Sequence, residues 1–383
     1  MRILVIGARG VPGVEGGAEK NAENLFPALA GDHAIRMLCL ANFCRRDSYR
    51  GLRIDRVATW QLFGTDKILY YLFSLVWTTR HRPDVIHCQG LNAAFFLWFY
   101  RLVARRVVVR YGSADYVNAK WGWIGRLGFR WCEWQLRWAD AVIAVTPSLR
   151  ERLRRVGVGE HVVVIPNAVD AVEVRPDDGA LARFGLEADG FVLAVGRVTW
   201  QKDFETLITA FEAARARAPE LAKLVIVGGD DGSGYLEHLQ RLGSERVIFT
   251  GRLPREELGG LYAACRLYVN SSRHEGLSNA ILEAVSHGSP ILVSDIVENR
   301  DLPIAAHHFF AVGDAAALAD KLREAWADAA TFTVDREAFA SWPEVVSATH
   351  RLYGILLATP KPASSTLGEA LGHPSTASQP TDS

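Results

Sequence analysis

Two carboxylates, Glu275 and Glu283, stand eight positions apart in the stretch SSRHEGLSNAILEAVSHGSP. Ser278 is typical of a helix N-cap, and Gly288 followed by Pro290 is typical of a helix end. We therefore expect Glu275 on the loop before a helix and Glu283 more than one turn inside it. Such carboxylates accept hydrogen bonds from hydroxyl groups, and N–H groups at a helix start hold phosphate or sugar oxygens. The candidate N–H donors are those of Gly276, Leu277, Ser278 and Asn279.

Two cations follow another expected strand. The run FVLAVG is typical of a buried strand, and Arg197 and Lys202 come after it, just ahead of a helix expected from Asp203. An Arg holds a diphosphate in a fork, and a Lys acts as a point charge. Such a pair can replace magnesium, and the chain contains no D-x-D motif. We expect no metal and no other cofactor; the alternative is a solvated basic loop.

A glycine-rich loop follows the first expected strand, in RILVIGARGVPGVEGGAEK. Glycines recur every third residue from Gly7, as in dinucleotide-binding dehydrogenases. That function requires a carboxylate after the second strand, where IRMLCLAN has none, and Pro12 lies where its helix should already run. The helix is instead expected after Gly16 and Gly17, with Glu19 in its first turn. A loop of this kind suits an anionic group, or is a glycine-rich turn without a ligand.

The composition is typical of a soluble globular protein, with 49% apolar and 22% charged residues and a net charge of zero. Basic residues outnumber acidic ones over residues 1–165, and acidic ones predominate afterwards, so two domains with different partners are expected. The five cysteines form no C-x-x-C pair, which argues against disulfides and zinc. No secretory signal is recognised. The apolar runs at residues 68–77 and 91–100 fall short of the roughly 18 residues that span a bilayer, and both are expected to be buried helices.

Strand-like runs alternate with helical segments twice along the chain, separated by a proline-containing passage that ends near Arg175. The pattern predicts the α/β class with two doubly wound, Rossmann-like domains, residues 1–165 and 176–340. Residues 341–358 are expected to form a helix that packs back towards the first domain. Residues 359–383, rich in Pro, Ser, Thr and Gly, are expected to be disordered. Ligands bind at the carboxyl ends of strands in such sheets, so the site is expected in a cleft between the domains.

The Gly-Gly loop, the Arg197 and Lys202 pair and the E-x7-E pair occur in an order that resembles the family-4 glycosyltransferases of the GT-B fold. The resemblance covers nearly all of residues 1–358. The stretches RGVPGVEGGAEK and AKWGWIGRLGFRWCEWQLRWADAVIAVTPSL are similar to a bacterial branch that contains rhamnosyltransferases of surface-polysaccharide assembly. The GT-B fold implies two Rossmann-like domains facing across a cleft, with the acceptor on the first and a nucleotide-sugar donor on the second.

The resemblance also implies roles for these residues. The donor would be a UDP- or dTDP-linked sugar, with Glu283 on its ribose and Glu275 on the sugar hydroxyls. Arg197 and Lys202 would neutralise the departing diphosphate, so these two and Glu275 are the expected catalytic residues. The reaction would retain the anomeric configuration, with the leaving phosphate taking the proton of the acceptor. Further donor contacts are expected from Gly16, Gly17, Gly276, Leu277, Ser278 and Asn279.

The chain departs from the family at the end of one strand of the first domain. Many relatives carry His-Gly there, whereas VVVRYGSADY offers Tyr111 and Gly112. Tyr111 is not cationic, so a charged contact to the sugar must come from elsewhere. Tyr111 and Asp115 are the candidates for sugar contacts, although Asp115 is equally typical of a turn.

The stretch Lys120–Trp138 is expected to face the acceptor side. It contains five tryptophans, with Arg126, Arg130 and Arg137 among them. Such side chains together suit a membrane interface, and the alternative is that the tryptophans are core. We expect a saccharide or polyprenyl-diphosphate-linked acceptor and no nucleic acid. The expected location is cytoplasmic, with peripheral contact at the inner face of the cell membrane.

Two other functions are compatible with the same fold. A nucleotide-sugar epimerase or hydrolase would need its own acid and base, and no such pair stands out. A non-catalytic nucleotide-sugar-binding protein is favoured by Tyr111. Turnover with an acceptor distinguishes both from a transferase.

Overall fold

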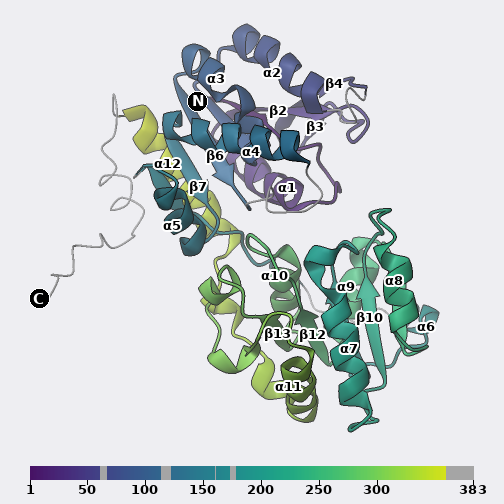
Figure 1. The fold of residues 1–383 in the computed structure, drawn as a ribbon. Coiled ribbons are helices and arrows are strands. Elements are labelled where there is room, and N and C mark those ends of the chain that lie inside the picture. The colour runs from purple at the N-terminus through teal and green to yellow at the C-terminus, as the bar shows by residue number, and fades with distance from the viewer. Residues whose placement is uncertain (61–66, 114–121, 160, 173–177, 359–383) are drawn as a thin grey trace, which may run out of the picture. The chain divides into compact units, whose positions relative to one another are not determined.

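The computed structural model describes residues 1–60, 67–113, 122–159, 161–172 and 178–358 (Figure 1). The chain forms two compact units. Unit 1 comprises Met1–Asn167 with the chain from Trp342 onward, and unit 2 comprises Ala168–Ser341. Unit 2 begins before the expected residue 176, because Val169 forms a parallel bridge with Ser341. The tail expected to be disordered lies outside the described residues.

Unit 1 is built on an eight-stranded sheet in the order β3-β4-β2-β1-β5-β6-β7-β8, parallel except where β3 meets β4. Its central strands are buried on both faces, as expected where helices cover both sides of a parallel sheet. The strands are β1 (Arg2–Ile6), β2 (Ala34–Leu40), β3 (Ser48–Tyr49), β4 (Leu52–Val57), β5 (Val85–Gln89), β6 (Arg106–Tyr111), β7 (Ala141–Ala144) and β8 (Val162–Val164).

The helices of unit 1 lie on both faces of this sheet. His87 of β5 points to one face, where its ring meets Phe26 of α1 at 5.1 Å and Tyr353 of α12 at 6.0 Å between centroids. The next residue, Cys88, points to the other face, with Sγ 3.6 Å from the carbonyl of Ala93 in η1. The helical elements are α1 (Gly17–Leu29), α2 (Lys67–His81), η1 (Leu91–Phe96), α3 (Leu97–Val103), α4 (Trp123–Gln135), η3 (Leu136–Trp138), α5 (Pro147–Arg155) and α12 (Trp342–Ala358).

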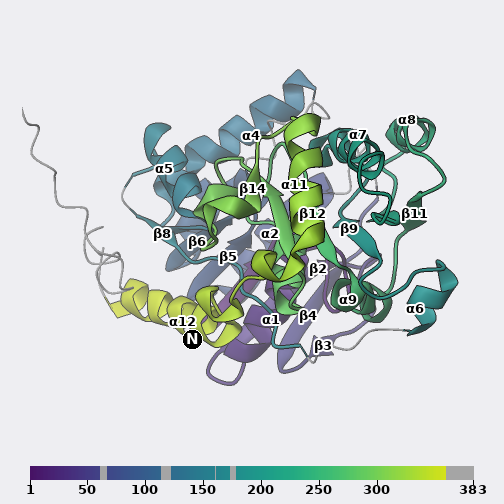
Figure 2. The ribbon, with the colours of Figure 1, turned by 90° about the horizontal axis from the view of Figure 1, so that it is seen from below.

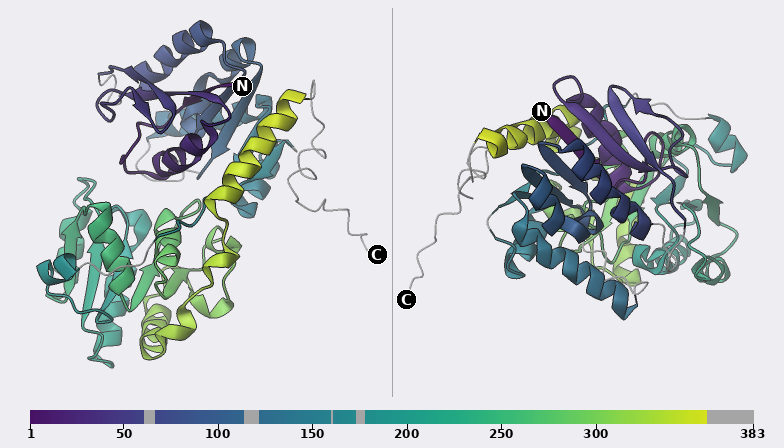
Figure 3. Two further views of the ribbon diagram at one scale, coloured as in Figure 1. Left: turned by 180° about the vertical axis from the view of Figure 1, so that it is seen from behind. Right: turned by 90° about the horizontal axis from the view of Figure 1, so that it is seen from above.

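The C-terminal helix α12 packs on unit 1 next to α1 (Figure 3). The Tyr353 hydroxyl shares a 2.5 Å hydrogen bond with His87 Nδ1. Arg106 Nε donates to Leu356 O at 2.5 Å, and Arg105 Nη2 donates to Leu357 O at 2.8 Å. The last carbonyl oxygens of a helix lack N–H donors from their own helix, so the two arginines complete the hydrogen bonding of this helix end.

Unit 2 is built on a six-stranded parallel sheet in the order β11-β10-β9-β12-β13-β14. This is the strand order of a doubly wound dinucleotide-binding sheet, and chain direction along the sheet reverses between β9 and β12. The predicted α/β class with two doubly wound units is thus confirmed. The strands are β9 (Phe191–Val195), β10 (Lys223–Val227), β11 (Val247–Gly251), β12 (Leu267–Asn270), β13 (Ile291–Ser294) and β14 (Phe309–Phe310).

Two apolar clusters cover the faces of the unit 2 sheet. One joins Phe211 of α7 to Trp326 of α11, and these helices lie side by side (Figure 2). The other joins Tyr262 of α9 to Ile281 and Leu282 of α10. The helices of unit 2 are α6 (Asp178–Arg183), α7 (Phe204–Arg215), α8 (Tyr235–Leu242), α9 (Arg255–Ala264), α10 (Asn279–Ser286) and α11 (Ala315–Ala327).

Three features of the described residues concern membranes, metals and disulfides. No described helix combines the length and apolar character needed to cross a membrane. No described group of three or more His, Cys, Asp and Glu side chains is placed to hold a metal ion. All five cysteines are buried, and none forms a disulfide.

The buried His87 makes the stability of the protein sensitive to acid. Burial, with the charge of Arg110 second, lowers the pKa of His87 to about 3. The unfolded chain protonates this imidazole below about pH 6.5. The stability that the neutral ring contributes is therefore present above that pH and is lost as the pH falls towards 3. We expect His87→Gln to lose less stability than wild type between about pH 7 and pH 5, measured by urea denaturation.

His238→Gln is the matched control, because His238 is 48% exposed. It should retain the acid sensitivity of wild type. Equal pH slopes for wild type and His87→Gln would contradict a neutral buried imidazole.

Candidate functional site

The loops after β9 and β12 meet at the point where the strand order of unit 2 reverses. Leu193 of β9 pairs with Tyr268 of β12. Beyond the strand ends, Arg273 N donates to Gln201 O at 2.9 Å and Gln201 Nε2 donates to His274 O at 2.8 Å. Open α/β sheets bind ligands outside the carboxyl ends of strands at such a point. These two loops therefore form the candidate site.

Lys202 and Glu275 form an ion pair across the two loops. Glu275 Oε1 also accepts a hydrogen bond from Ser272 Oγ at 2.8 Å, and Ser271 Oγ donates to Lys202 O at 2.7 Å. Both charged side chains are mostly buried, at 17% and 12% exposed. The sequence predicted a role for each residue, and the structure adds that they are bonded to each other.

Two glycines allow close packing at the loop after β9, Gly196 against the Lys202 side chain and Gly228 against the backbone of Gly196. A Cβ on Gly196 would lie 2.7 Å from Lys202 Cε, and a Cβ on Gly228 would lie 1.8 Å from Gly196 O. No side chain fits at either position without movement. The glycine after β9 thus lets the lysine stem lie against the backbone and reach Glu275.

Arg197 lies beside this pair on the loop after β9. Its side chain is exposed, and it forms no ion pair with any residue that the structure describes. The next residue, Val198, donates its N–H to Gly229 O at 2.9 Å, so the backbone that carries Arg197 is fixed. The guanidinium is available to an anion at the switch point.

Glu283 lies inside α10 and is half-buried. The Tyr262 hydroxyl donates to Glu283 Oε2 at 3.2 Å, and the Tyr262 ring stacks on His287 at 5.5 Å between centroids. Burial, followed by the charge of Glu283, raises the pKa of Tyr262 well above its usual value, so this hydroxyl stays a donor. Nothing in the sequence signalled Tyr262 as the partner of Glu283.

The helix α10 begins at Asn279 with Ser278 in the N-cap position, as predicted. The expected capping hydrogen bond is wrong, because the Ser278 side chain makes none. Its Oγ accepts instead from Asn270 Nδ2 of β12 at 3.4 Å. The serine ties the loop to the sheet and does not occupy the first N–H groups of the helix.

Glu298, after β13, is a carboxylate that the sequence analysis missed. Burial raises its pKa, and the charge of Glu275 acts in the same direction. Glu298 follows β13, the strand next to β12, in the run LVSDIVENR, and this position after a strand end could have marked it as a candidate site residue.

In unit 1, the glycine loop after β1 is held by Glu19 in the first turn of α1. This buried carboxylate accepts from Arg9 N at 3.2 Å and pairs with Arg9 Nε at 2.8 Å. Gly16 adopts a φ of 138°, and Gly16 and Gly17 are both exposed. The helix was expected after Gly17 and begins at Gly17, one residue earlier, with Glu19 in its first turn as predicted; the pairing of Glu19 with Arg9 was not predicted.

Tyr111 lies in the interior of unit 1, at the end of β6. Its hydroxyl donates to Glu133 Oε1 at 2.8 Å, and Arg152 Nη2 lies 3.3 Å from the same carboxylate oxygen. The Tyr111 side chain has no exposed surface, so it cannot contact a sugar in this conformation. The proposed site therefore does not include Tyr111. The other candidate, Asp115, lies outside the described residues.

The tryptophans of the predicted membrane stretch are on the surface. Trp123, Trp131, Trp134 and Trp138 are 76%, 40%, 41% and 39% exposed, so the alternative that they are core is wrong. Trp131 stacks on Trp134 at 5.3 Å, and the Arg137 guanidinium lies 5.3 Å from the Trp134 ring. Lys120 and Trp121 lie outside the described residues.

The two apolar runs expected to be buried helices are only partly buried. In α2, Ile68, Leu72 and Val76 are 37%, 44% and 56% exposed, and Phe95 and Trp98 of the second run are 39% and 45% exposed. Together with α4, these elements give unit 1 an extensive apolar surface.

The fold defines a protein of the GT-B class. The structure is similar to that of HepE from Anabaena, solved in complex with UDP and glucose, with a TM-score of 0.75 and 19% identity over 93% of this chain and all of that one. The profile described as Glycosyltransferase Family 4 matches residues 15–173, and the profile described as Glycosyl transferases group 1 matches residues 190–328. The chain belongs to the family-4 glycosyltransferases.

Two relatives of known name are similar in sequence. The lipopolysaccharide core biosynthesis glycosyltransferase LpsE of Rhizobium meliloti is 28% identical over 284 residues, which cover 73% of this chain and 76% of LpsE. Mannosylfructose-phosphate synthase of Agrobacterium fabrum is 32% identical over 174 residues, or 41% of this chain. That match spans only 38% of the length of the synthase.

Gly16→Ala should disrupt the glycine loop. A Cβ at this position would lie 2.1 Å from Glu19 Oε2 and 2.9 Å from Arg9 Nη2, in a backbone conformation that favours glycine. We expect a loss of about 2 kcal/mol in the free energy of unfolding, measured by urea denaturation. Gly31→Ala is the control, because a Cβ at Gly31 has no neighbour within 4 Å. Equal stability of the two variants would contradict this description of the loop.

Proposed function

We propose that this protein transfers a sugar, with retention of configuration, from a UDP- or dTDP-linked donor to a glycan or lipid-linked saccharide of the bacterial cell surface. The observation that carries the proposal is the assembly of Arg197, Lys202 and Glu275 at the switch point of unit 2. The named roles of LpsE in lipopolysaccharide core biosynthesis and the UDP and glucose bound to HepE support the acceptor and donor classes. The two stretches similar to the bacterial branch that contains rhamnosyltransferases make rhamnose the sugar we propose.

The donor would occupy the loops after β9 and β12. Its diphosphate would lie between Arg197, Lys202 and the start of α10, where cations and helix N–H groups converge on an anion. Glu283 would accept hydrogen bonds from the ribose, supported by Tyr262. N–H groups of Gly276, Leu277, Ser278 and Asn279 would serve the diphosphate or sugar, and Gly16 and Gly17 would let the unit 1 loop approach the diphosphate.

The ion pair between Lys202 and Glu275 has a specific consequence for this chemistry. An arriving diphosphate competes with Glu275 for the lysine ammonium, and the carboxylate then turns to sugar hydroxyls. When the bond between the sugar and the diphosphate breaks, negative charge grows on the leaving group. Arg197 and Lys202 stabilise that charge, and the leaving phosphate accepts the proton of the acceptor hydroxyl. In this scheme the two cations take the place of a magnesium ion.

Arg197→Ala and Lys202→Ala should each lower kcat by about a hundredfold or more, because each removes a charge that acts on the transition state. Binding of UDP should weaken much less. Transfer of sugar from a UDP- or dTDP-sugar to a lipid-linked saccharide, in the presence of EDTA, measures the first quantity, and calorimetry with UDP measures the second.

Arg217→Ala is the matched control, since it removes an arginine of unit 2 that is 72% exposed. It should leave both quantities unchanged. Glu283→Ala should show the opposite pattern to the cation variants, with weaker UDP binding as its main effect. Wild-type kcat in both cation variants would overturn the mechanism, and loss of all transfer in EDTA would overturn its metal independence.

The surface of α4 and η3 would hold unit 1 against an anionic membrane, where a polyprenyl-diphosphate-linked acceptor resides. Exposed tryptophans with arginines between them match the boundary between acyl chains and head groups. Arg126, Arg130 and Arg137 are all exposed, and the carboxylate of α4, Glu133, is bonded inside to Tyr111. We therefore propose a peripheral location at the inner face of the cell membrane.

Arg126→Ala/Arg130→Ala should bind vesicles of phosphatidylglycerol and phosphatidylcholine about thirtyfold more weakly than wild type, because each of the two basic groups near an anionic surface contributes about 1 kcal/mol. Co-flotation with the vesicles measures this. Arg217→Ala/Arg246→Ala removes the same charge from unit 2 and should bind as wild type does. Equal flotation with and without phosphatidylglycerol would end the proposal.

A further inference from the structure

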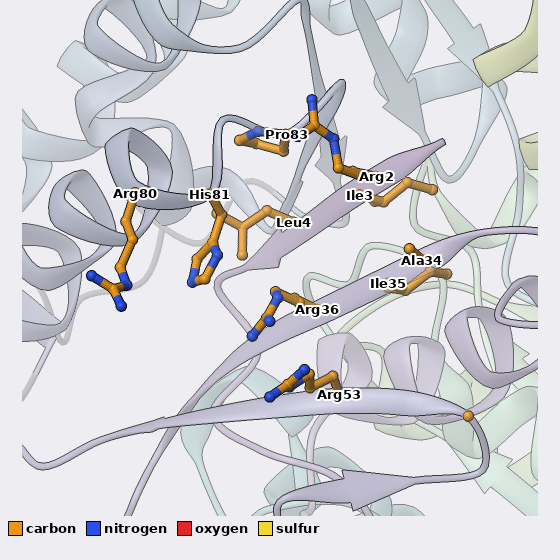
Figure 4. A pocket seen from close by; sticks show the side chains of 11 residues that line it. Arg2, Ile3, Leu4, Ala34, Ile35, Arg36, Arg53, Arg80, His81 and Pro83 are labelled. Atoms are coloured by element: carbon orange, nitrogen blue, oxygen red, sulfur yellow. The ribbon is translucent and has the colours of Figure 1, made fainter.

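Unit 1 contains a basic pocket that the proposed reaction does not use. The pocket has a volume of about 490 Å³ and lies at the amino ends of β1, β2 and β4, next to the end of α2 (Figure 4). Figure 4 shows Arg36, Arg53 and His81 projecting to the same side, with Arg80 beside His81. Ligands of doubly wound sheets bind at the carboxyl ends of strands, so this pocket is at the other end of the unit 1 sheet. Its lining is Arg2, Ile3, Leu4, Ala34, Ile35, Arg36, Gly51, Arg53, Arg80, His81 and Pro83.

The pocket has an excess of positive charge. No Asp or Glu is among its lining residues. Arg36 is held by Asp55 at 3.0 Å, and Arg2 lies 3.4 Å from Asp84. Arg53 and Arg80 have no carboxylate partner among the residues that the structure describes.

His81 adds no charge at neutral pH. Burial, and then the nearby charge of Arg36, lowers the pKa of His81, and its Nε2 lies 4.0 Å from Asp55. The two uncompensated groups are therefore the guanidinium groups of Arg53 and Arg80. Guanidinium groups bind phosphate oxygens through paired N–H donors, so the pocket suits a phosphate group.

An exposed apolar stripe on α2 leads to this pocket. Ile68, Leu72 and Val76 follow one another at intervals of four residues, and the next position of the same stripe is Arg80. Residues four apart lie on one face of a helix. The helix α2 carries no Asp or Glu anywhere along its length. An apolar stripe that ends in an arginine matches a lipid, whose acyl chains adjoin a phosphate.

We propose that this pocket binds the phosphate head group of an anionic membrane lipid, whose acyl chains face the stripe on α2. The proposal rests on the membrane contact proposed for α4 and extends it to a second element of unit 1. Arg53 and Arg80 bind the phosphate oxygens, and Ile68, Leu72 and Val76 contact the acyl chains. Charge complementarity selects an anionic lipid over a zwitterionic one.

The test uses the full chain with Arg53→Gln/Arg80→Gln. The matched control is Arg45→Gln/Arg154→Gln, which removes the same charge from two exposed arginines of unit 1 outside the pocket. We expect the pocket variant to bind phosphatidylglycerol vesicles about thirtyfold more weakly than wild type and the control to stay within about twofold. Urea denaturation followed by circular dichroism should show the wild-type transition of unit 1 in both variants, and UDP binding to unit 2, measured by calorimetry, should be unchanged.

Two further measurements separate the other outcomes. Equal vesicle binding by the pocket variant and its control would overturn the pocket proposal. If vesicle binding is then weakened only in Arg126→Ala/Arg130→Ala, the membrane contact proposed for α4 still holds. Glycerol 3-phosphate, titrated by calorimetry without vesicles, tests whether the pocket binds a soluble phosphate compound and not a lipid head group. Binding of that compound to wild type but not to the pocket variant, with equal vesicle binding by all variants, would assign the pocket to a free phosphate and overturn the lipid assignment.

Discussion

The ion pair between Lys202 and Glu275 is the contact on which the organisation of the candidate site depends. It joins loops that are more than seventy residues apart in the chain, and it forms because the strand order makes β9 and β12 neighbours. Two mostly buried charges are stable only when they are paired and hydrogen bonded, and Ser272 supplies the additional hydrogen bond. The result is a preorganised cation and carboxylate at the position where doubly wound sheets bind ligands.

Much of this organisation was predictable, because it follows from local patterns. The apolar runs, the glycines that end them and the caps identify the strand ends that carry Arg197 and Glu275. They also identify the helix start at Asn279 and, to within one residue, the helix start at Gly17. Side-chain partners were not predictable in the same way. The hydrogen bonds between Asn270 and Ser278 and between Tyr262 and Glu283 depend on how neighbouring elements pack. No residue spacing in the sequence encodes these pairs.

Exposure was the other property that local patterns did not settle. Runs such as ILYYLFSLVW carry apolar residues all round the expected helix, which is typical of buried segments. In unit 1, only one side of α2 and of α4 is buried, and apolar side chains on the other side of each helix are exposed. The same composition would serve a core or a membrane surface, and only the position of each helix on the sheet distinguishes them.

The place of α12 in the fold has a consequence for biosynthesis. The helix is the last described element of the chain, yet its Tyr353 hydroxyl supplies the hydrogen bond to His87 Nδ1 in unit 1. As the polypeptide leaves the ribosome, Met1–Asn167 emerges first and must wait for unit 2 to be translated before α12 arrives. Until then the sheet surface around His87 and Phe26 lacks its cover, so the nascent protein carries an exposed apolar face of the kind that chaperones recognise.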